Sequence, residues 1–294
     1  MSLPPLAAEV LFHLGPLPVT NSLVNTCLAT LIFVVFAFVF SRSIRVIPGR
    51  GQLFIEQVLE TLLGYFDKVT GDRALSRKFL PFAGSLFFFV LISNWLGLLP
   101  GTGSIGVWLN HHAGESEFVP LLRPANSDLN LTLALAVLTV ISSHIVGAVS
   151  VGPLTHIGRF IQLGGIWKAL RSGKVIGILT ALVEFVVGLI ELMTEVAKMA
   201  SLSLRLFGNI FAGEVLTTVI ASLFAFAAPL PFIALESIVG VVQATVFTML
   251  ALVYFTLFSR MPHGHAAHDD KHHDKHSKHE VEVPEQGTEA LPVS

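Results

Sequence analysis

Charged residues and cysteine are scarce in this chain of 294 residues. Asp, Glu, Lys and Arg make up 13% of it, against about 25% in a typical soluble domain, while hydrophobic residues make up 53%. The single cysteine, Cys27, excludes a disulfide framework. A formal net charge of −2 offers no electrostatic attraction for nucleic acid. The scarcity of charge excludes an ordinary soluble domain and indicates that a lipid bilayer surrounds most of the chain.

Two common sequence signals are also missing. Residues 1–20 contain no Lys or Arg, so they do not resemble a cleaved signal peptide or a transit peptide. No Gly-x-x-x-x-Gly-Lys-Ser/Thr loop occurs, which excludes a nucleotide site of that type on this chain. We therefore expect a chain that is not itself an enzyme, with no catalytic residue, no metal site and no cofactor.

Long apolar runs take the place of these signals. About 20 apolar residues cross the hydrocarbon core of a bilayer as a helix. Five runs reach that length: 21–40, 79–99, 129–149, 175–227 and 232–258. Pro229 and Pro231 separate the last two runs and are expected to form a turn, because proline does not continue a helix. The sequence predicts an all-α polytopic membrane protein with about five membrane helices.

The basic residues lie almost entirely on one side of these runs. If residues 175–227 cross the membrane once, fifteen of the 18 Lys and Arg fall on the same side. Arg123 falls on the other side, and Lys198 and Arg205 lie within the membrane. The positive-inside rule then predicts three parts: an external N-terminal segment (1–20), a membrane domain (21–260) and a cytoplasmic tail (261–294).

The fourth apolar run is too long for a simple crossing. As one helix, its roughly 50 residues would measure about 75 Å, against about 30 Å for the hydrocarbon core. The run either crosses twice, with a break at Gly208 or Gly213, or crosses once at a steep tilt. The distribution of charge favours one crossing, but the sequence leaves both interpretations open.

Residues 52–66 and the C-terminal tail differ from the apolar runs. Apolar side chains recur at helical spacing from Phe54 to Phe66, opposite polar ones, which predicts an amphipathic helix. This helix either lies on the cytoplasmic membrane surface or packs as a short helix on a partner. Residues 261–294 carry seven of the twelve histidines without a recurring ligand spacing, so we expect a disordered tail.

Seven ionisable residues interrupt the last two apolar runs. Each costs about 2.5–3.5 kcal/mol to insert into a membrane, so residues of this kind usually serve a function. They are Glu184, Glu191, Glu195, Lys198, Arg205, Glu214 and Glu236. Some of them could extend toward water from helix ends, and Lys198 could simply pair with a neighbouring acid. Arg205 is flanked by apolar sequence on both sides, which makes it the strongest functional candidate.

The spacing of these residues in the sequence predicts which of them share a face of a helix. One polar stripe repeats every seven residues and ends with a step of four; its members are Glu184, Glu191, Lys198, Arg205 and Asn209. Glu191 would lie about 21 Å before Arg205 along the helix axis, and Glu214 about 13 Å beyond it on the opposite side. In the last run, Glu236 and Gln243 are also seven residues apart and share a face.

Arg205 therefore has carboxylates on both sides of it along the helix. Arginine stays charged and cannot pass a proton on, whereas a glutamic acid in a partly wet cavity can. A fixed cation between two proton-exchanging groups acts as a barrier. Transport past this barrier needs a moving partner that carries a carboxylate.

Three segments resemble signatures of one family, subunit a of the F-type ATP synthases. Residues 201–214 (SLSLRLFGNIFAGE) match its arginine motif almost position for position, residues 94–100 (NWLGLLP) resemble its second-span motif, and residues 128–132 (DLNLT) resemble the start of its third span. The resemblance implies a membrane subunit with a long, tilted C-terminal helical hairpin beside a ring of c subunits. Peripheral-stalk b subunits are the other implied partners. Arg205 matches the essential arginine that faces the ring carboxylate.

The resemblance also implies roles for other polar residues. Asn209 and Glu191 match polar positions of the cytoplasmic half-channel. Glu214 and Gln243 match positions of the opposite half-channel. Glu236 stands where some members have a histidine paired with the residue that matches Glu214, so two facing acids would share a proton here.

The function expected from this resemblance is a proton-translocating stator subunit with two aqueous half-channels against the ring, in a bacterial inner membrane rather than a mitochondrial one. Two other classes remain open. A stand-alone secondary transporter or channel would use the same charges and transport ions alone, although no internal repeat supports it. A scaffold or metal-binding protein built around the histidine-rich tail would leave Arg205 without a function. The choice between H⁺ and Na⁺ is not made by this sequence.

Overall fold

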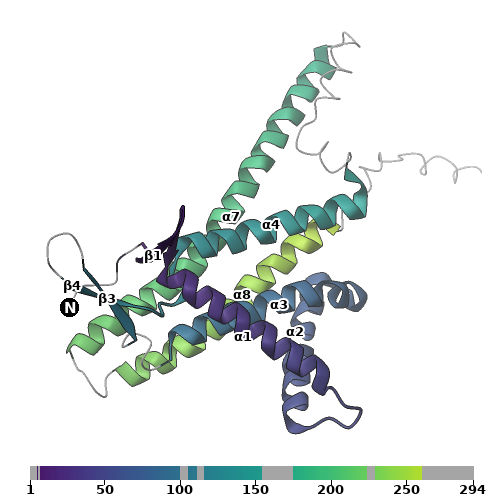
Figure 1. The fold of residues 1–294 in the computed structure, drawn as a ribbon. Helices are drawn as coiled ribbons and strands as arrows, with labels where there is room; N and C mark the ends of the chain where they lie inside the picture. The colour runs from purple at the N-terminus through teal and green to yellow at the C-terminus, as the bar shows by residue number, and fades with distance from the viewer. Residues whose placement is uncertain are drawn as a thin grey trace, which may run out of the picture. The chain divides into compact units, whose positions relative to one another are not determined.

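The computed structural model describes Pro5 and residues 7–99, 105–110, 116–153, 175–223 and 229–259. The expected C-terminal tail, 261–294, lies outside the described residues. The elements in chain order are β1 (Val10–Leu14), β2 (Leu17–Thr20), α1 (Asn21–Ser43), α2 (Arg50–Thr70), α3 (Arg73–Gly97), β3 (Gly106–Asn110), β4 (Ser116–Pro120), the 3-10 helix η2 (Ala125–Ser127), α4 (Leu129–Val151), α7 (Val175–Leu223) and α8 (Pro229–Ser259). Figure 1 shows these helices with the two short hairpins.

Four helices are long and apolar enough to cross a membrane: α1, α3, residues Leu129–Ser150 of α4, and α8. α7 is a fifth long helix that continues without interruption over 49 residues. The alternative with a break at Gly208 or Gly213 is therefore wrong, and a continuous helix crosses a membrane only once. At about 74 Å, α7 is much longer than the hydrocarbon core is thick. The predicted class, an all-α polytopic membrane protein, is confirmed.

Helix starts follow from local side-chain chemistry. Thr20, Asp72 and Asp128 each accept a hydrogen bond from a backbone N–H two or three residues further on, which caps α1, α3 and α4. The predicted turn at Pro229 and Pro231 is wrong, because α8 begins at Pro229. The N–H groups in the first turn of a helix have no partner within the helix, so proline loses nothing there.

Two antiparallel hairpins were not predicted from the sequence. β1 pairs with β2 through a turn at Gly15, whose φ of 66° favours glycine, and β3 pairs with β4. The first hairpin leads directly into α1, where the backbone N–H of Asn21 donates to the carbonyl of Glu9 at 3.1 Å. Strands of four or five residues produce too short a pattern to separate from apolar loops.

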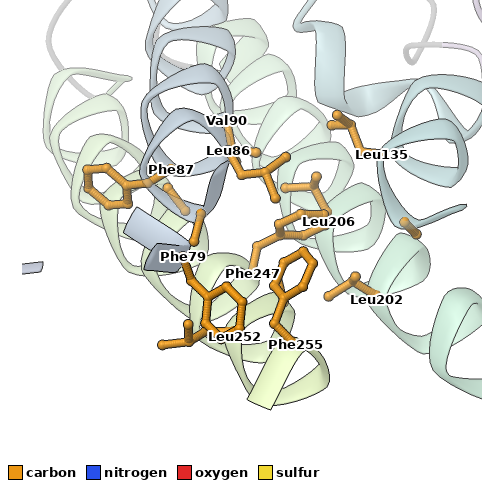
Figure 2. Packing of buried hydrophobic residues seen from close by; sticks show 14 of the residues in the cluster. Phe79, Leu86, Phe87, Val90, Leu135, Leu202, Leu206, Phe247, Leu252 and Phe255 are labelled. Atoms are coloured by element: carbon orange, nitrogen blue, oxygen red, sulfur yellow. The ribbon is translucent and has the colours of Figure 1, made fainter. Parts of the chain in front are cut away.

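Aromatic and aliphatic side chains of α2, α3, α4, α7 and α8 form the core, part of which Figure 2 shows. The rings of Phe79 and Phe255 stack with centroids 5.4 Å apart, and Phe82 meets Phe255 edge-on at 5.1 Å. Phe247 and Leu206 of the same cluster are fully buried. Truncating a buried phenylalanine costs about 3–5 kcal/mol, so this cluster fixes α8 alongside α3 and α7.

α2 confirms the predicted amphipathic helix, and its two halves differ. Phe66, in the C-terminal half, is buried in the core, whereas Phe54 near the start is exposed. Arg73 at the start of α3 donates to Glu60 and Asp67 of α2. The C-terminal half of α2 therefore packs within this chain, and only the first half keeps an open apolar face for a membrane surface or a partner.

Candidate functional site

Arg205 lies on the outward face of α7. Leu202 and Leu206 point into the core and are buried, while Arg205, Gly208 and Asn209 are exposed. This alternation follows the helical period. No acid among the described residues forms an ion pair with Arg205. The chain thus presents a fixed cation on its surface.

Asn209 and Gln243 come together beside that surface. The Nδ2 of Asn209 donates to the Oε1 of Gln243 at 3.5 Å, which is the long limit of a hydrogen bond. Gln243 is buried, and its Nε2 has no partner among the residues described. An unsatisfied buried donor costs about 1–3 kcal/mol, so this amide retains a donor for an additional acceptor.

Glu236 is 8% exposed and is held by α7. Its Oε2 accepts a hydrogen bond from the Oγ1 of Thr217 at 3.1 Å. Gly213 allows this approach, because a Cβ at that position would stand 2.2 Å from the Oε1 of Glu236. The acid therefore rests directly on the turn of α7 that also carries Glu214.

Glu214 pairs with a cation that the sequence placed in an external loop. The Nε of Arg123 lies 3.0 Å from the Oε1 of Glu214, and its Nη2 lies 3.3 Å from the Oε2. Its Nη1 donates to the carbonyl of Ala7 at 3.1 Å and its Nη2 to the carbonyl of Pro5 at 2.8 Å. The side chain of Arg123 is only 3% exposed and that of Glu214 is 15% exposed. This ion pair is largely withdrawn from water and joins the N-terminal segment to α7.

Sequence reasoning missed Arg123 as a site residue. The signal was present, because Arg123 is the only Lys or Arg on its side of the membrane domain in the predicted topology. The sequence also led us to expect that Glu214 and Glu236 share a proton. In the structure each carboxylate has its own donor, and within the described ranges no hydrogen bond joins the two acids.

Buried amides hold the segment around Arg123 in place. The Nδ2 of Asn25 in α1 donates to the backbone carbonyl of Arg123 at 2.7 Å. The Nδ2 of Asn126 in η2 donates to the Oδ1 of Asn94 in α3 at 2.6 Å. Asn94 also donates to the carbonyl of Gly240 at 3.2 Å, which reaches α8. The position of the arginine is therefore fixed by three of the long helices.

A second charged cluster lies near the middle of α7. The Nζ of Lys198 donates to the Oε1 of Glu195 at 2.7 Å, and the Nε2 of His144 lies 3.6 Å from the Oε2 of the same acid. Lys198 thus pairs with a neighbouring acid, which is the simpler of its two interpretations. Glu191 is partly buried one turn earlier. The structure does not bring Glu191 to Arg205, since both lie on one continuous helix.

Comparison with known proteins indicates one family. The model of the family described as ATP synthase A chain matches residues 23–256, which include Arg123, Arg205, Glu214 and Glu236. ATP synthase subunit a of Moorella thermoacetica is 31% identical over 255 residues, covering 87% of this chain and 96% of that protein. ATP synthase subunit a of Mycobacterium ulcerans is 32% identical over 251 residues, covering 84% and 89%. ATP synthase subunit a 2 of a Bradyrhizobium species is 27% identical over 250 residues. The chain belongs to the ATP synthase A chain family.

Proposed function

We propose that this chain is the proton-translocating stator subunit of the membrane sector of an F-type ATP synthase. The observation that carries the proposal is Arg205, an unpaired cation among the described residues that faces outward from a membrane helix. A charge in that position is costly unless a partner supplies an opposite charge. The partner that we propose is a ring of c subunits, each with a membrane carboxylate.

The outward position of Arg205 suits a barrier to direct ion flow. At about 4 Å and an effective dielectric constant of about 20, two unit charges attract by about 4 kcal/mol. Arg205 would hold a ring carboxylate ionised as it passes. Each ring carboxyl group then has to take a proton on one side of Arg205 and release it on the other, which couples proton flow to rotation.

Two aqueous half-channels would serve these two exchanges. On the external side of Arg205 we place Glu214, Glu236 and Gln243, and on the cytoplasmic side Glu191. The resemblance implies the cytoplasmic side for Asn209, but its hydrogen bond to Gln243 favours the external side. The N-terminus would lie outside and the C-terminus in the cytoplasm of a bacterium, with the b subunits of the peripheral stalk holding the chain in place. Nucleotide chemistry would take place on other subunits of the complex.

Substitution of Arg205 tests this function. Inverted membrane vesicles that contain the complex with Arg205→Ala should show no ATP-driven acidification, because the barrier and the partner charge are lost. Arg50→Ala is the matched control, since Arg50 is an exposed arginine at the start of α2. Coupled pumping by the Arg205→Ala complex at the control rate would refute the proposal.

Reconstitution separates this proposal from a stand-alone transporter. The purified chain in liposomes should pass no protons by itself, whereas the complete complex should pump. Proton conduction by the chain alone, abolished by Arg205→Ala, would favour the transporter instead.

A further inference from the structure

Several hydrogen bonds hold the Arg123–Glu214 pair, whereas Arg205 is exposed. Arg123 reaches both oxygens of Glu214, and its remaining donors bind the carbonyls of Pro5 and Ala7. Guanidinium–carboxylate pairs bound at both oxygens are strong and fixed in geometry. If Glu214 took up a proton, Arg123 would remain as an uncompensated buried cation, which is strongly unfavourable. The geometry therefore holds the side chain of Glu214 as a fixed partner of Arg123.

Glu236 has different surroundings. Its donor is the hydroxyl of Thr217, which can donate to a carboxylate or accept from a carboxylic acid. No cation of the described residues pairs with Glu236. The charged group of the described residues that acts on Glu236 is Glu214, on the adjoining turn of α7, which is itself paired with Arg123. The helix α3 places the neutral Asn94 against Gly240, one turn further along α8. Glu236 can change its charge without leaving a buried cation unpaired.

We propose that Arg123 is a positioning residue that fixes Glu214 as a carboxylate, and that Glu236 is the acid that exchanges protons on this side of the membrane. This inference rests on the proposed function. During pumping, the Glu236 carboxylate takes a proton from a ring carboxyl group, and the resulting Glu236 acid gives that proton to external water. Arg123 and Glu214 keep their charges throughout.

The arginine also affects Glu236 through Glu214. The negative charge of Glu214 opposes ionisation of Glu236, and the guanidinium of Arg123 beside Glu214 offsets part of that repulsion. Without Arg123, the uncompensated carboxylate of Glu214 repels a second negative charge, so Glu236 holds its proton more tightly. Removing the charge of Glu214 as well should reverse that effect.

The experiment measures the initial rate of ATP-driven acidification in inverted vesicles and divides it by the amount of assembled complex in each preparation. Per complex, we expect Arg123→Gln to lower the initial pumping rate at least about tenfold, and Arg123→Gln combined with Glu214→Gln to restore most of the rate. Glu214→Gln alone should keep measurable pumping. Glu236→Gln should lower the rate by about a hundredfold or more, as loss of a proton-transfer group does. Glu56→Gln, at an exposed acid of α2, is the matched control.

The dependence on lumenal pH separates an effect of charge from a loss of structure. The vesicle lumen corresponds to the external side, where Glu236 has to release its proton. We expect the lumenal pH at which pumping falls to half its maximum to move upward in Arg123→Gln and to return in the double variant. A purely structural role would lower assembly without moving this pH.

The proposal is overturned if Glu236→Gln pumps at the control rate. It is also overturned if Glu214→Gln is as inactive as Glu236→Gln, both alone and when combined with Arg123→Gln. Should Arg123→Gln fail to assemble, the comparison of Glu214→Gln with Glu236→Gln still decides which acid exchanges protons. Failure of the proposed function would appear differently, as pumping that does not depend on Arg205.

Discussion

Gly213→Ala should reposition the Glu236 carboxylate with little effect on the fold. The added Cβ would lie 2.2 Å from the Oε1 and 2.6 Å from the Cδ of Glu236, so the carboxylate has to move by about 1 Å or more to reach normal contact. Losing the hydrogen bond to Thr217 costs about 1.5–3 kcal/mol, and replacing glycine by alanine within a helix recovers up to about 1 kcal/mol. The net destabilisation is about 0.5–2 kcal/mol. By contrast, a misplacement of about 1 Å in a reacting group can slow a reaction about a hundredfold.

The assay measures two quantities on the same preparation: the initial rate of ATP-driven acidification and the thermal stability of the solubilised complex. Gly64→Ala is the matched control, because Gly64 lies inside α2 and a Cβ there would meet nothing within 4 Å. We expect Gly213→Ala to lose most of its pumping while its stability stays close to that of the control. Pumping at the control rate would refute the placement of Glu236 in the proton path, and unfolding of the variant would refute the view that only the carboxylate moves.

Two further predictions concern the packing around the site. Gly97→Ala places a Cβ 2.7 Å from the Cβ of Pro124 and 2.9 Å from its Cα, so the backbone has to shift. We expect thermal denaturation to show a destabilisation of about 1–3 kcal/mol. An unchanged midpoint would contradict this contact. The guanidinium of Arg73 lowers the pKa of Asp67 from its ordinary value, so the stability that this carboxylate provides is present above about pH 4 and lost as the pH falls through the lowered pKa. Far-UV circular dichroism of thermal unfolding at pH 6 and pH 3.5 should therefore show a smaller loss on acidification for Asp67→Asn than for the wild type, and equal losses would argue against the ion pair.

Most of the helices could be predicted from the apolar runs of the sequence, because the thickness of a bilayer fixes the length of such a run. The predicted runs 21–40 and 129–149 lie within α1 and α4, and their starts coincide with the observed helix starts. α3 begins six residues before the predicted run 79–99, since Asp72 caps a polar first turn that hydropathy does not detect. The continuity of α7 could not be predicted either, because Gly208 and Gly213 are compatible with both a break and a close helix contact.

The site was predictable only where a single residue was unusual by itself. Arg205 stands out as a charge within apolar sequence, and its outward position agrees with a role at an interface. The importance of Arg123 depends on Glu214, which lies 91 residues further along the chain, and no local pattern connects the two. The need for glycine at position 213 likewise becomes visible only in the structure, where Glu236 of α8 packs against it.

The order of synthesis adds a consequence of the Arg123–Glu214 pair. The two residues are 91 positions apart, so at about 5–20 residues per second the arginine is added to the chain about 5–18 s before its carboxylate partner. The carbonyls of Pro5 and Ala7 are made before either residue and already suit two of the guanidinium donors. The N-terminal segment can therefore shelter the arginine during membrane insertion, and the arrival of α7 then completes the pair.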